Sequence, residues 1–472
     1  MRHEPPVRDR DVSIWQSAKY DNVHDWTTTR NEPRTAPAGG DAGPLRKRAA
    51  GGEAGPLEKR APSAPAAPAR SRQAPGKAAP RSLAARIRGL IARYSTLDWL
   101  GWLQCEWQYL RYSVEARFPQ YNDWKTQTPP SLAYGVIEYR LPNSCRILMI
   151  GDWGTHMTDN VAMLRQALKK FAPDAIIHLG DVYYSGTRYE CEQNVLAVLD
   201  RLVQELRIKR PPFFTLPGNH DYYSGGRGFY EMIGRINAGL PGCEQKASYF
   251  CLRTADDRWQ FLGMDTGYND RDPINQKSPA LVASEAEWHR DKLDRFGGTT
   301  ILLSHHQLFS AKEVLSKGAR PWLNEDLHAA FQPYYDRVAA WFWGHEHNLI
   351  LFKDALSFTG DRWPLRKGRL LGCSAYEETV DEDPFGINPV CKAAEFMDGM
   401  PRLELSKYRS ELQKFYDHAF ALLEVSPQQI TASYYAYPSW DQDFQMPAEP
   451  ALGAALYSEI LPPVERQPAP AA

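Results

Sequence analysis

Side chains that bind metals well follow five apolar runs of this 472-residue chain. The runs are predicted strands, and they end in the sequences GDWG, GDVYYSG, GNHD, SHHQ and GHEH. Each sequence alone would be an ordinary turn or a structural histidine, because Gly, Asp and Asn favour tight turns. Together they place carboxylates, an amide and imidazoles at strand ends, and transition metals bind such donors. The donors are Asp152, Asp181, Asn219, His305, His345 and His347.

These donors are too many for one ion. Two carboxylates, an amide oxygen and three imidazoles suit two ions that share a carboxylate and a hydroxide, as in dinuclear hydrolases. Two other side chains compete as a further ligand of the first ion: Tyr184 in the second motif and His156, four residues after Asp152. A phenolate from Tyr184 would favour a ferric ion and a coloured protein, whereas an imidazole from His156 would favour manganese, ferrous iron or zinc.

Strands and helices alternate around these motifs. This order predicts an α/β (α+β) protein in which sheets are covered by helices, with the chemistry at the carboxyl ends of strands. Ser284 and Glu287 form the pattern of a capping box at the start of one helix. The predicted strands are 145–150, 175–180, 212–218, 299–306 and 338–347, the hairpins are 249–266 and 420–437, and the helices are 160–171, 193–208 and 284–296.

The chain divides into four predicted parts. Residues 1–81 are a largely disordered basic arm that is rich in Pro, Ala and Gly and holds a 12-residue tandem repeat. Residues 82–140 are a helical, aromatic-rich segment that we expect to pack on the catalytic domain rather than on a membrane surface. Residues 141–440 form the catalytic domain, within which 351–418 is a predicted capping insertion. Residues 441–472 are a C-terminal tail.

Charge and cysteine content limit the class of protein. The net charge is −1, yet residues 34–93 hold thirteen Lys or Arg against three acids, so the arm is suited to an acidic partner. The seven cysteines lack CxxC spacing and are expected to be free thiols, with Cys243 and Cys251 the one pair to check. No apolar run is long enough for a membrane span, and the start lacks the apolar stretch of a secretory signal. A cytoplasmic protein is therefore expected.

The five motifs also occur in the order typical of one family. The stretch from Arg146 to Tyr437 resembles the calcineurin-like metallophosphoesterase superfamily. Most members begin with Asp-x-His, whereas this chain has Asp152-Trp153-Gly154, and its second motif is Gly-Asp-x-x-Tyr. That combination is similar to the purple acid phosphatase branch, in which the tyrosine replaces the missing histidine. The resemblance implies two sheets in a β-sandwich flanked by helices, four layers in all.

The resemblance further implies a role for each motif. Two metal ions would be bound, Fe(III) with Fe, Mn or Zn as the second ion. Asp181 would bridge them, and the hydroxide between them would attack phosphorus in line. His220 would protonate the leaving oxygen, and Asp221 would orient its imidazole. The first ion would take Asp152, Tyr184 and His347, the second would take Asn219, His305 and His345, and His306, Tyr222 and Arg227 are candidate substrate contacts.

The leading hypothesis is a phosphatase that acts on phosphomonoesters of small molecules or proteins. The same site would serve a phosphodiesterase or nuclease if the pocket accepted a second substituent. The catalytic part has no evident basic groove with interleaved aromatics, which argues against nucleic acid. A non-catalytic scaffold that binds partners through the arm is the third hypothesis, and it is disfavoured because every expected ligand position is occupied.

Overall fold

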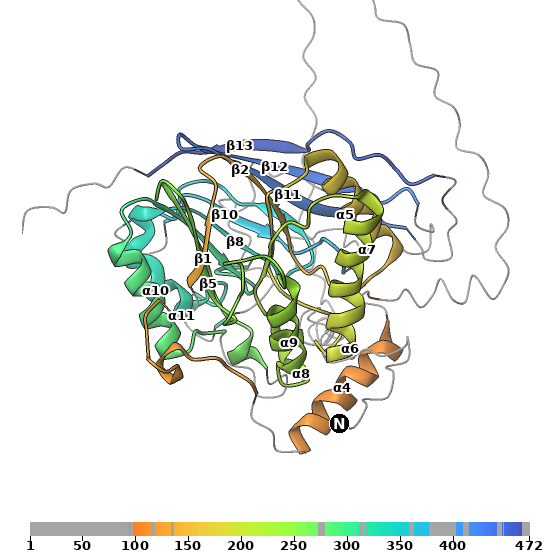
Figure 1. The fold of residues 1–472 in the computed structure, drawn as a ribbon, viewed down its shortest axis with the longest axis horizontal. Helices are drawn as coiled ribbons and strands as arrows, with labels where there is room; N and C mark the ends of the chain where they lie inside the picture. Colours follow the sequence, from red (N-terminus) through yellow and green to blue (C-terminus); the bar gives the residue numbers. More distant parts are fainter. Residues whose placement is uncertain are drawn as a thin grey trace, which may run out of the picture.

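Figure 1 shows the fold of the computed structural model. The structure describes residues 94, 98–114, 119–133, 136–271, 279–310, 315–316, 320–357, 363–376, 403–408, 415–440, 446 and 448–464. The predicted arm 1–81, the start of the helical segment and much of the capping insertion, including 377–402, lie outside these residues. The acidic partner of the arm and the cytoplasmic location stay predictions.

One sheet has seven strands in the order β1-β5-β6-β7-β8-β10-β9. Strands β6, β7, β8 and β10 are parallel neighbours, and β5 and β6 form the predicted antiparallel hairpin. The bounds are β1 Val136–Leu141, β5 Phe250–Thr254, β6 Trp259–Gly263, β7 Thr299–Ser304, β8 Val338–Trp343, β9 Leu349–Leu351 and β10 Gly368–Leu371.

The second sheet has six strands in the order β13-β12-β11-β2-β3-β4. Strands β2, β3 and β4 are parallel, and β11 and β12 form the second predicted hairpin. β13 differs from the prediction, because it lies in the expected C-terminal tail yet pairs with β12 along five residues. The bounds are β2 Cys145–Ile150, β3 Ala175–His178, β4 Phe213–Thr215, β11 His418–Val425, β12 Ile430–Tyr437 and β13 Tyr457–Leu461.

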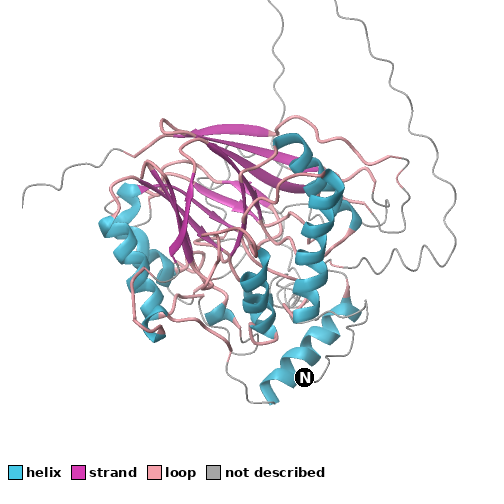
Figure 2. Cartoon of the chain, in the orientation of Figure 1, coloured by secondary structure: helices cyan, strands magenta, loops and turns pink. Residues whose placement is uncertain are grey.

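The two sheets pack face to face between helices, which gives the four layers that the resemblance implied (Figure 1 and Figure 2). Helices α5 (Thr158–Phe171) and α7 (Ala197–Leu206) cover the six-stranded sheet, while α10 (Ala283–Arg295) and α11 (Glu325–Phe331) cover the other. Alternate residues of a strand point to opposite faces. Ile147 therefore lies between the sheets, whereas its neighbour Leu148 packs on the helices.

Helix α10 begins without the predicted capping box. Its N-cap residue is Val282, which has no side-chain cap. The Ser284 hydroxyl donates instead to Asp123 Oδ2 (2.7 Å), and Glu287 forms an ion pair with Lys125. The segment before the catalytic domain thus takes both side chains that the capping box would need.

Within the predicted helical segment lies α4 (Trp99–Val114), which packs on α8 (Asn219–Tyr223). Trp107 on its outer face is 63% exposed. Among the described residues no helix is both long and apolar enough to span a membrane. The six cysteines in the described part of the chain are free, including Cys243 and Cys251.

A buried ion pair joins β10 of the seven-stranded sheet to β13 of the six-stranded sheet. Arg369 on β10 donates through Nε and Nη2 to the two carboxylate oxygens of Glu459 on β13, each at 2.7 Å. Tyr434 Oη donates to the same carboxylate, and Lys367 Nζ lies 2.9 Å from it. Burial by itself would raise the pKa of Glu459, but Arg369 and Lys367 outweigh burial and lower the pKa to about 2.

We expect Glu459→Gln to lower the free energy of unfolding by about 3 kcal/mol at neutral pH, because it removes the charged carboxylate that accepts two hydrogen bonds from the buried Arg369. The carboxylate has a lowered pKa when folded, so its contribution is present above its ordinary pKa of 4.5 and is lost as the pH falls toward about 2. Urea unfolding of both proteins over that range measures the difference. Asp354→Asn, at an exposed partner of the same arginine, should cost less than about 1 kcal/mol. A difference that grows at low pH would contradict this account.

Candidate metal centre

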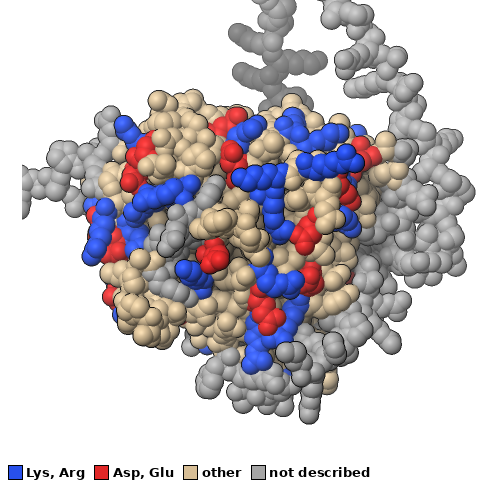
Figure 3. Space-filling view, in the orientation of Figure 1, with Lys and Arg blue, Asp and Glu red and all other residues tan. Residues whose placement is uncertain are grey.

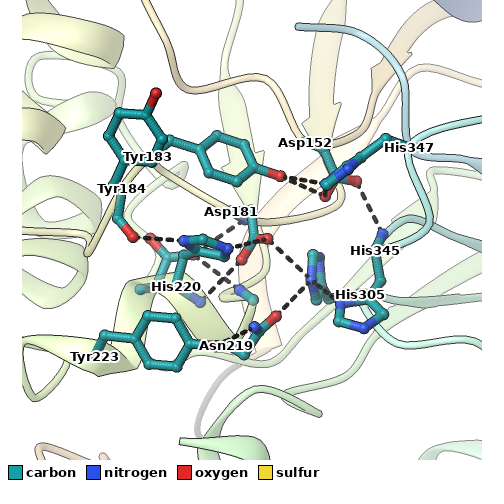
Figure 4. Close-up of polar contacts among 12 residues, drawn as sticks. Asp152, Asp181, Tyr183, Tyr184, Asn219, His220, Tyr223, His305, His345 and His347 are labelled. Carbon is teal, nitrogen blue, oxygen red and sulfur yellow. Dashed lines mark hydrogen bonds and ion pairs between the residues drawn. The ribbon is translucent and has the colours of Figure 1, made fainter. Parts of the chain in front are cut away.

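The carboxyl ends of β2, β3, β4, β7 and β8 meet at one point, and the loops that follow them carry the predicted donors (Figure 4). β2, β3 and β4 belong to one sheet, and β7 and β8 belong to the other. Within each sheet, parallel strands end at the same edge, so residues far apart in sequence come together there. The six donors are each at most 8% exposed. They are Asp152, Asp181, Asn219, His305, His345 and His347.

One half of the site is built around Asp152. Its Oδ1 accepts the hydroxyl of Tyr183 (2.9 Å) and lies 3.6 Å from His347 Nε2. The Tyr183 hydroxyl is also 2.9 Å from that nitrogen. The other oxygen, Oδ2, accepts the backbone N–H of His345 (2.9 Å), which fixes the carboxylate between two motifs. A carboxylate, a phenol and an imidazole thus face one another.

The other half is built around His305. Its Nε2 lies 3.2 Å from Asn219 Oδ1, 3.1 Å from His345 Nδ1 and 3.4 Å from Asp181 Oδ2. Its Nδ1 is 3.0 Å from the Leu179 carbonyl, which can only accept, so Nδ1 carries the proton and Nε2 faces the cluster. The amide of Asn219 donates to Tyr223 Oη (2.7 Å), which turns its oxygen toward His305.

The chemistry of these residues is suited to binding metal cations. Asp181 Oδ2 is buried and accepts no hydrogen bond from any described residue, although buried carboxylate oxygens are costly to leave without a partner. Two groups of three donors have their ligand atoms within 4.8 Å of one another: Asp152, Asp181 and His305, and His305, His306 and His345. A Cβ on Gly218 would lie 1.9 Å from Asp181 Oδ1, so only glycine lets this loop approach the carboxylate.

The charges of the cluster act strongly on one another. Burial raises the pKa of Asp152 well above its usual range, and the charge of Asp181 adds to this rise against the opposing effect of His305. Burial disfavours the charged form of His305, but Asp181 and Asp152 outweigh it and raise its pKa to about 9. His305 and His220 in turn hold the pKa of Asp181 below its usual range despite burial. The carboxylates therefore need positive charge nearby, which protons or metal ions can supply.

Tyr184 does not face the cluster, contrary to the sequence-based expectation. Its hydroxyl donates to Asp98 Oδ2 (3.1 Å) and accepts the backbone N–H of Tyr94, whose ring stacks on it at 4.4 Å. The neighbouring Tyr183 takes the expected position instead, and Figure 4 shows the two rings on different sides of the turn. The sequence holds two adjacent tyrosines at this position, and the Gly-Asp-x-x-Tyr motif of the resembling family points to the second of them, Tyr184.

The competing ligand His156 is also absent from the cluster. Its ring is exposed and hydrogen-bonds to Asn194 Oδ1. A histidine at position 154, where most of the superfamily has one, has no room: a Cβ there would lie 2.6 Å from the Asp181 carbonyl oxygen. The Tyr183 hydroxyl lies instead 2.9 Å from both Asp152 Oδ1 and His347 Nε2.

His220 is oriented by a backbone carbonyl rather than by Asp221. Its Nδ1 lies 2.5 Å from the Tyr184 carbonyl oxygen and its Nε2 lies 3.8 Å from Asp181 Oδ2. Asp221 Oδ2 accepts the backbone N–H groups of Asp181 (3.1 Å) and Gly218 (2.8 Å), so it fixes two loops instead. A partner on the main chain leaves no residue type to recognise, which is why the sequence pointed to the adjacent carboxylate.

The three predicted substrate contacts lie in different places in the structure. Tyr222 is 1% exposed and donates to Asp265 Oδ2 (2.6 Å), so it lies in the core. Arg227 begins α9 (Arg227–Ile236) with an exposed side chain. His306 lies at the cluster: its ring is 4.3 Å from that of His345, and its Nε2 is 3.2 Å from Asp270 Oδ2.

Tyr376, which the sequence analysis did not assign, packs at the cluster. Its ring lies 4.2 Å from that of His347 and 4.7 Å from that of Tyr183. It comes from the described part of the predicted capping insertion 351–418. One residue of that insertion thus reaches the site, and no motif surrounds it that could have marked it.

Comparison with known protein families identifies the part of the chain that carries these residues. Residues 145–349 match the family model described as calcineurin-like phosphoesterase. This part of the chain therefore resembles a calcineurin-like phosphoesterase domain. The match begins at β2 and ends just after His347, so it spans all five motifs of the phosphoesterase domain. The search of the curated proteins found no match.

Solved structures are similar to the chain at low sequence identity. PhoD is 14% identical, with 69% of each chain covered and a TM-score of 0.43. The purple acid phosphatase PPD1 from yellow lupin (Lupinus luteus) seeds is 15% identical, covering 65% of this chain and 53% of its own, with a TM-score of 0.38. GAP50, titled the anchor in the inner membrane complex of Plasmodium, is 13% identical, covering 68% and 89%, with a TM-score of 0.40.

Proposed function

We propose that this protein is a dinuclear metal-dependent phosphoesterase that hydrolyses phosphomonoesters. The observation that supports it most is the buried Asp181 carboxylate, which faces His305 on one side and His220 on the other. Its Oδ2 accepts no hydrogen bond from the described residues. A shared carboxylate between two donor sets is what a pair of ions needs, and the family of the domain is one of phosphoesterases.

The donor sets divide between the two ions. Asp152, Tyr183 and His347 would bind the first ion, with Tyr183 replacing Tyr184 of the sequence-based hypothesis. Asn219, His305 and His345 would bind the second, and Asp181 would bind both. When bound, such ions lower the pKa of a water molecule to near neutrality and withdraw charge from phosphoryl oxygens. A phenolate donor favours Fe(III) at the first site, with Fe, Mn or Zn at the second.

His220 would supply the proton for the leaving oxygen. The Tyr184 carbonyl can only accept a hydrogen bond, so Nδ1 keeps its proton and Nε2 faces the cluster. As an imidazolium, His220 would carry a second proton on Nε2 and could give that proton to the leaving oxygen while Nδ1 stays bonded to the carbonyl. Asp221 acts on the loops around it, because its carboxylate holds the backbone of Asp181 and Gly218.

A nuclease is the alternative that the surface disfavours. Figure 3 shows Lys and Arg side chains interspersed with Asp and Glu over the face in view. Several arginines of the described residues form ion pairs, such as Arg165 with Glu205 and Glu449, and Arg235 with Glu192. Nucleic acid binding needs a stripe of unopposed positive charge, and no such stripe is visible on this face.

The test compares esters of the two classes. We expect about two metal ions per chain by elemental analysis, and faster hydrolysis of p-nitrophenyl phosphate than of bis(p-nitrophenyl) phosphate. Faster hydrolysis of the diester would move the assignment to a phosphodiesterase. A metal-loaded protein that hydrolyses neither ester would contradict the proposed function, and a protein that binds no metal would contradict the donor assignment.

The tyrosine assignment has its own spectroscopic prediction. If the first ion is ferric, the protein should show a visible charge-transfer band from the Tyr183 phenolate. We expect Tyr183→Phe to abolish this band and Tyr184→Phe to leave it in place, because only Tyr183 reaches Asp152 and His347. Absorption spectra of the two purified variants, with iron content measured in each, make the comparison. Loss of the band in Tyr184→Phe alone would restore the original assignment.

A further inference from the structure

The carbonyl that orients His220 is itself held by α4. The Tyr184 carbonyl oxygen accepts the hydrogen bond from His220 Nδ1 and a second one from the thiol of Cys105, with Sγ at 3.2 Å. Cys105 is 2% exposed, and burial raises the pKa of its thiol, so the thiol keeps the proton that it donates. A helix outside the matched family segment thus contacts the acceptor of the proposed general acid.

The side chain of Tyr184 is held by the same N-terminal segment. Asp98 accepts its hydroxyl proton, and Tyr94 stacks on its ring with an angle of 8° between the planes. All three side chains are at most 8% exposed. The aromatic ring of Tyr184 therefore anchors its backbone to the segment that leads into α4.

On its other side, the turn is held by one carboxylate. Glu190 accepts the backbone N–H groups of Tyr184 (2.6 Å), Ser185 (3.1 Å) and Thr187 (2.9 Å). The peptide that presents the carbonyl to His220 is thus fixed between Glu190 within the domain and α4 outside it. Figure 4 shows the Tyr184 carbonyl directed at His220 while its hydroxyl points away from the cluster.

A second contact runs from α4 to the proposed metal ligand Asn219. The Tyr109 ring lies 6.5 Å from that of Tyr223, whose hydroxyl accepts the Asn219 amide. Tyr223 also packs at 5.0 Å on the ring of His220. Two neighbouring residues of the GNHD motif are therefore supported by α4 through different tyrosines.

We propose that Tyr94 and residues 98–114 are part of the catalytic apparatus and fix the tautomer and direction of His220 through Tyr184. In this proposal Cys105, Asp98 and Tyr184 are positioning residues, and none of them touches the substrate. The proposal rests on the proposed function, because it assigns His220 the protonation of the leaving oxygen. It extends the working domain beyond residues 145–349, which the family model covers.

The nature of the leaving group separates positioning from stability. A good leaving group such as p-nitrophenolate departs without a proton, whereas phenolate from phenyl phosphate needs one. A misdirected His220 should therefore slow phenyl phosphate and spare p-nitrophenyl phosphate. We expect Cys105→Ala and Asp98→Asn to lower kcat/KM for phenyl phosphate by about tenfold and that for p-nitrophenyl phosphate by about twofold or less.

Matched variants control for the helix itself. Cys105→Ser keeps a donor at the same position and should retain most of the activity toward phenyl phosphate. Trp107→Ala removes an exposed side chain from the outer face of α4 and should change neither rate. Metal content and thermal unfolding of each variant show whether the fold and the centre are intact.

A second readout does not depend on turnover. In the zinc-loaded full-length protein, the hydrogen-bonded Nδ1 proton of His220 should give a downfield imidazole resonance, identified by its loss in His220→Asn. We expect this resonance to shift or broaden in Cys105→Ala and to stay in place in Cys105→Ser and Trp107→Ala. An unchanged resonance in Cys105→Ala would overturn the proposal, as would equal losses of rate on the two esters. A wild-type protein that hydrolyses neither ester would instead contradict the proposed function, while the resonance would still test the positioning.

Discussion

Asp181→Asn is expected to release bound metal and to abolish hydrolysis. The carboxylate lies 3.4 Å from His305 in one half of the site and has a ligand atom within 4.8 Å of one from Asp152 in the other half, and its lowered pKa reflects the positive groups around it. An asparagine has nearly the same shape but no charge, so the two ions would lose the ligand that offsets their repulsion. We expect kcat/KM to fall by on the order of 10³-fold, a loss typical of removing a central electrostatic group. Elemental analysis and p-nitrophenyl phosphate assays measure the two effects.

Asp265→Asn is the matched control for that experiment. Asp265 is as buried as Asp181, and its pKa of about 7 is raised by burial and by Glu285, but it faces Tyr222 in the core. This variant should keep its metal and its rate, since no donor of the cluster contacts it. A variant of Asp181 that keeps two ions and most of its activity would show that the bridging role belongs elsewhere.

The donors could be predicted from sequence because each lies within four residues after the end of a strand. His305 and His306 come after β7, and His345 and His347 follow β8 within four residues. The register of parallel neighbours then brings these ends to one edge of a sheet. Position along the chain therefore specifies position in space for these residues, and five of them meet around Asp181 as the motifs predicted.

The directions of side chains in turns could not be predicted in the same way. In an irregular turn there is no period of two to say which neighbour faces inward. Tyr183 and Tyr184 are adjacent and chemically identical, and the choice between them depends on Glu190, Asn194 and α4. These partners lie in other motifs or outside the domain, so nothing local in the pattern marks them.

Four strands were not predicted from the sequence for a similar reason. β1, β9, β10 and β13 are edge or short strands whose neighbours supply their pairing. β13 shows exposed Tyr457 and Ile460 beside the buried Glu459, which is the reverse of the usual apolar-in pattern. The Glu459 carboxylate can be buried because it forms ion pairs there with Arg369 and Lys367. Such a strand is recognised only when its partner across the interior is known.

His220→Asn is expected to lower kcat by about 10²-fold to 10⁴-fold, the usual contribution of a general acid. In contrast to Asp181→Asn, this variant should keep both metal ions, because the His220 imidazole bonds to a backbone carbonyl rather than standing among the closest donors. The loss should be larger for phenyl phosphate than for p-nitrophenyl phosphate, which needs less help from a proton donor.

The hydrolysis rates of His220→Asn on both esters and its metal content per chain test this prediction. His156→Asn is the control, since that ring is exposed and bonded to Asn194 outside the cluster. Its rates should equal those of the wild type, which would also exclude the competing ligand of the sequence-based hypothesis. Equal losses on the two esters in His220→Asn would mean that the imidazole stabilises phosphoryl charge rather than donating a proton. The leaving oxygen would then depend on another acid, and His306, whose ring lies 4.3 Å from that of His345, is a candidate.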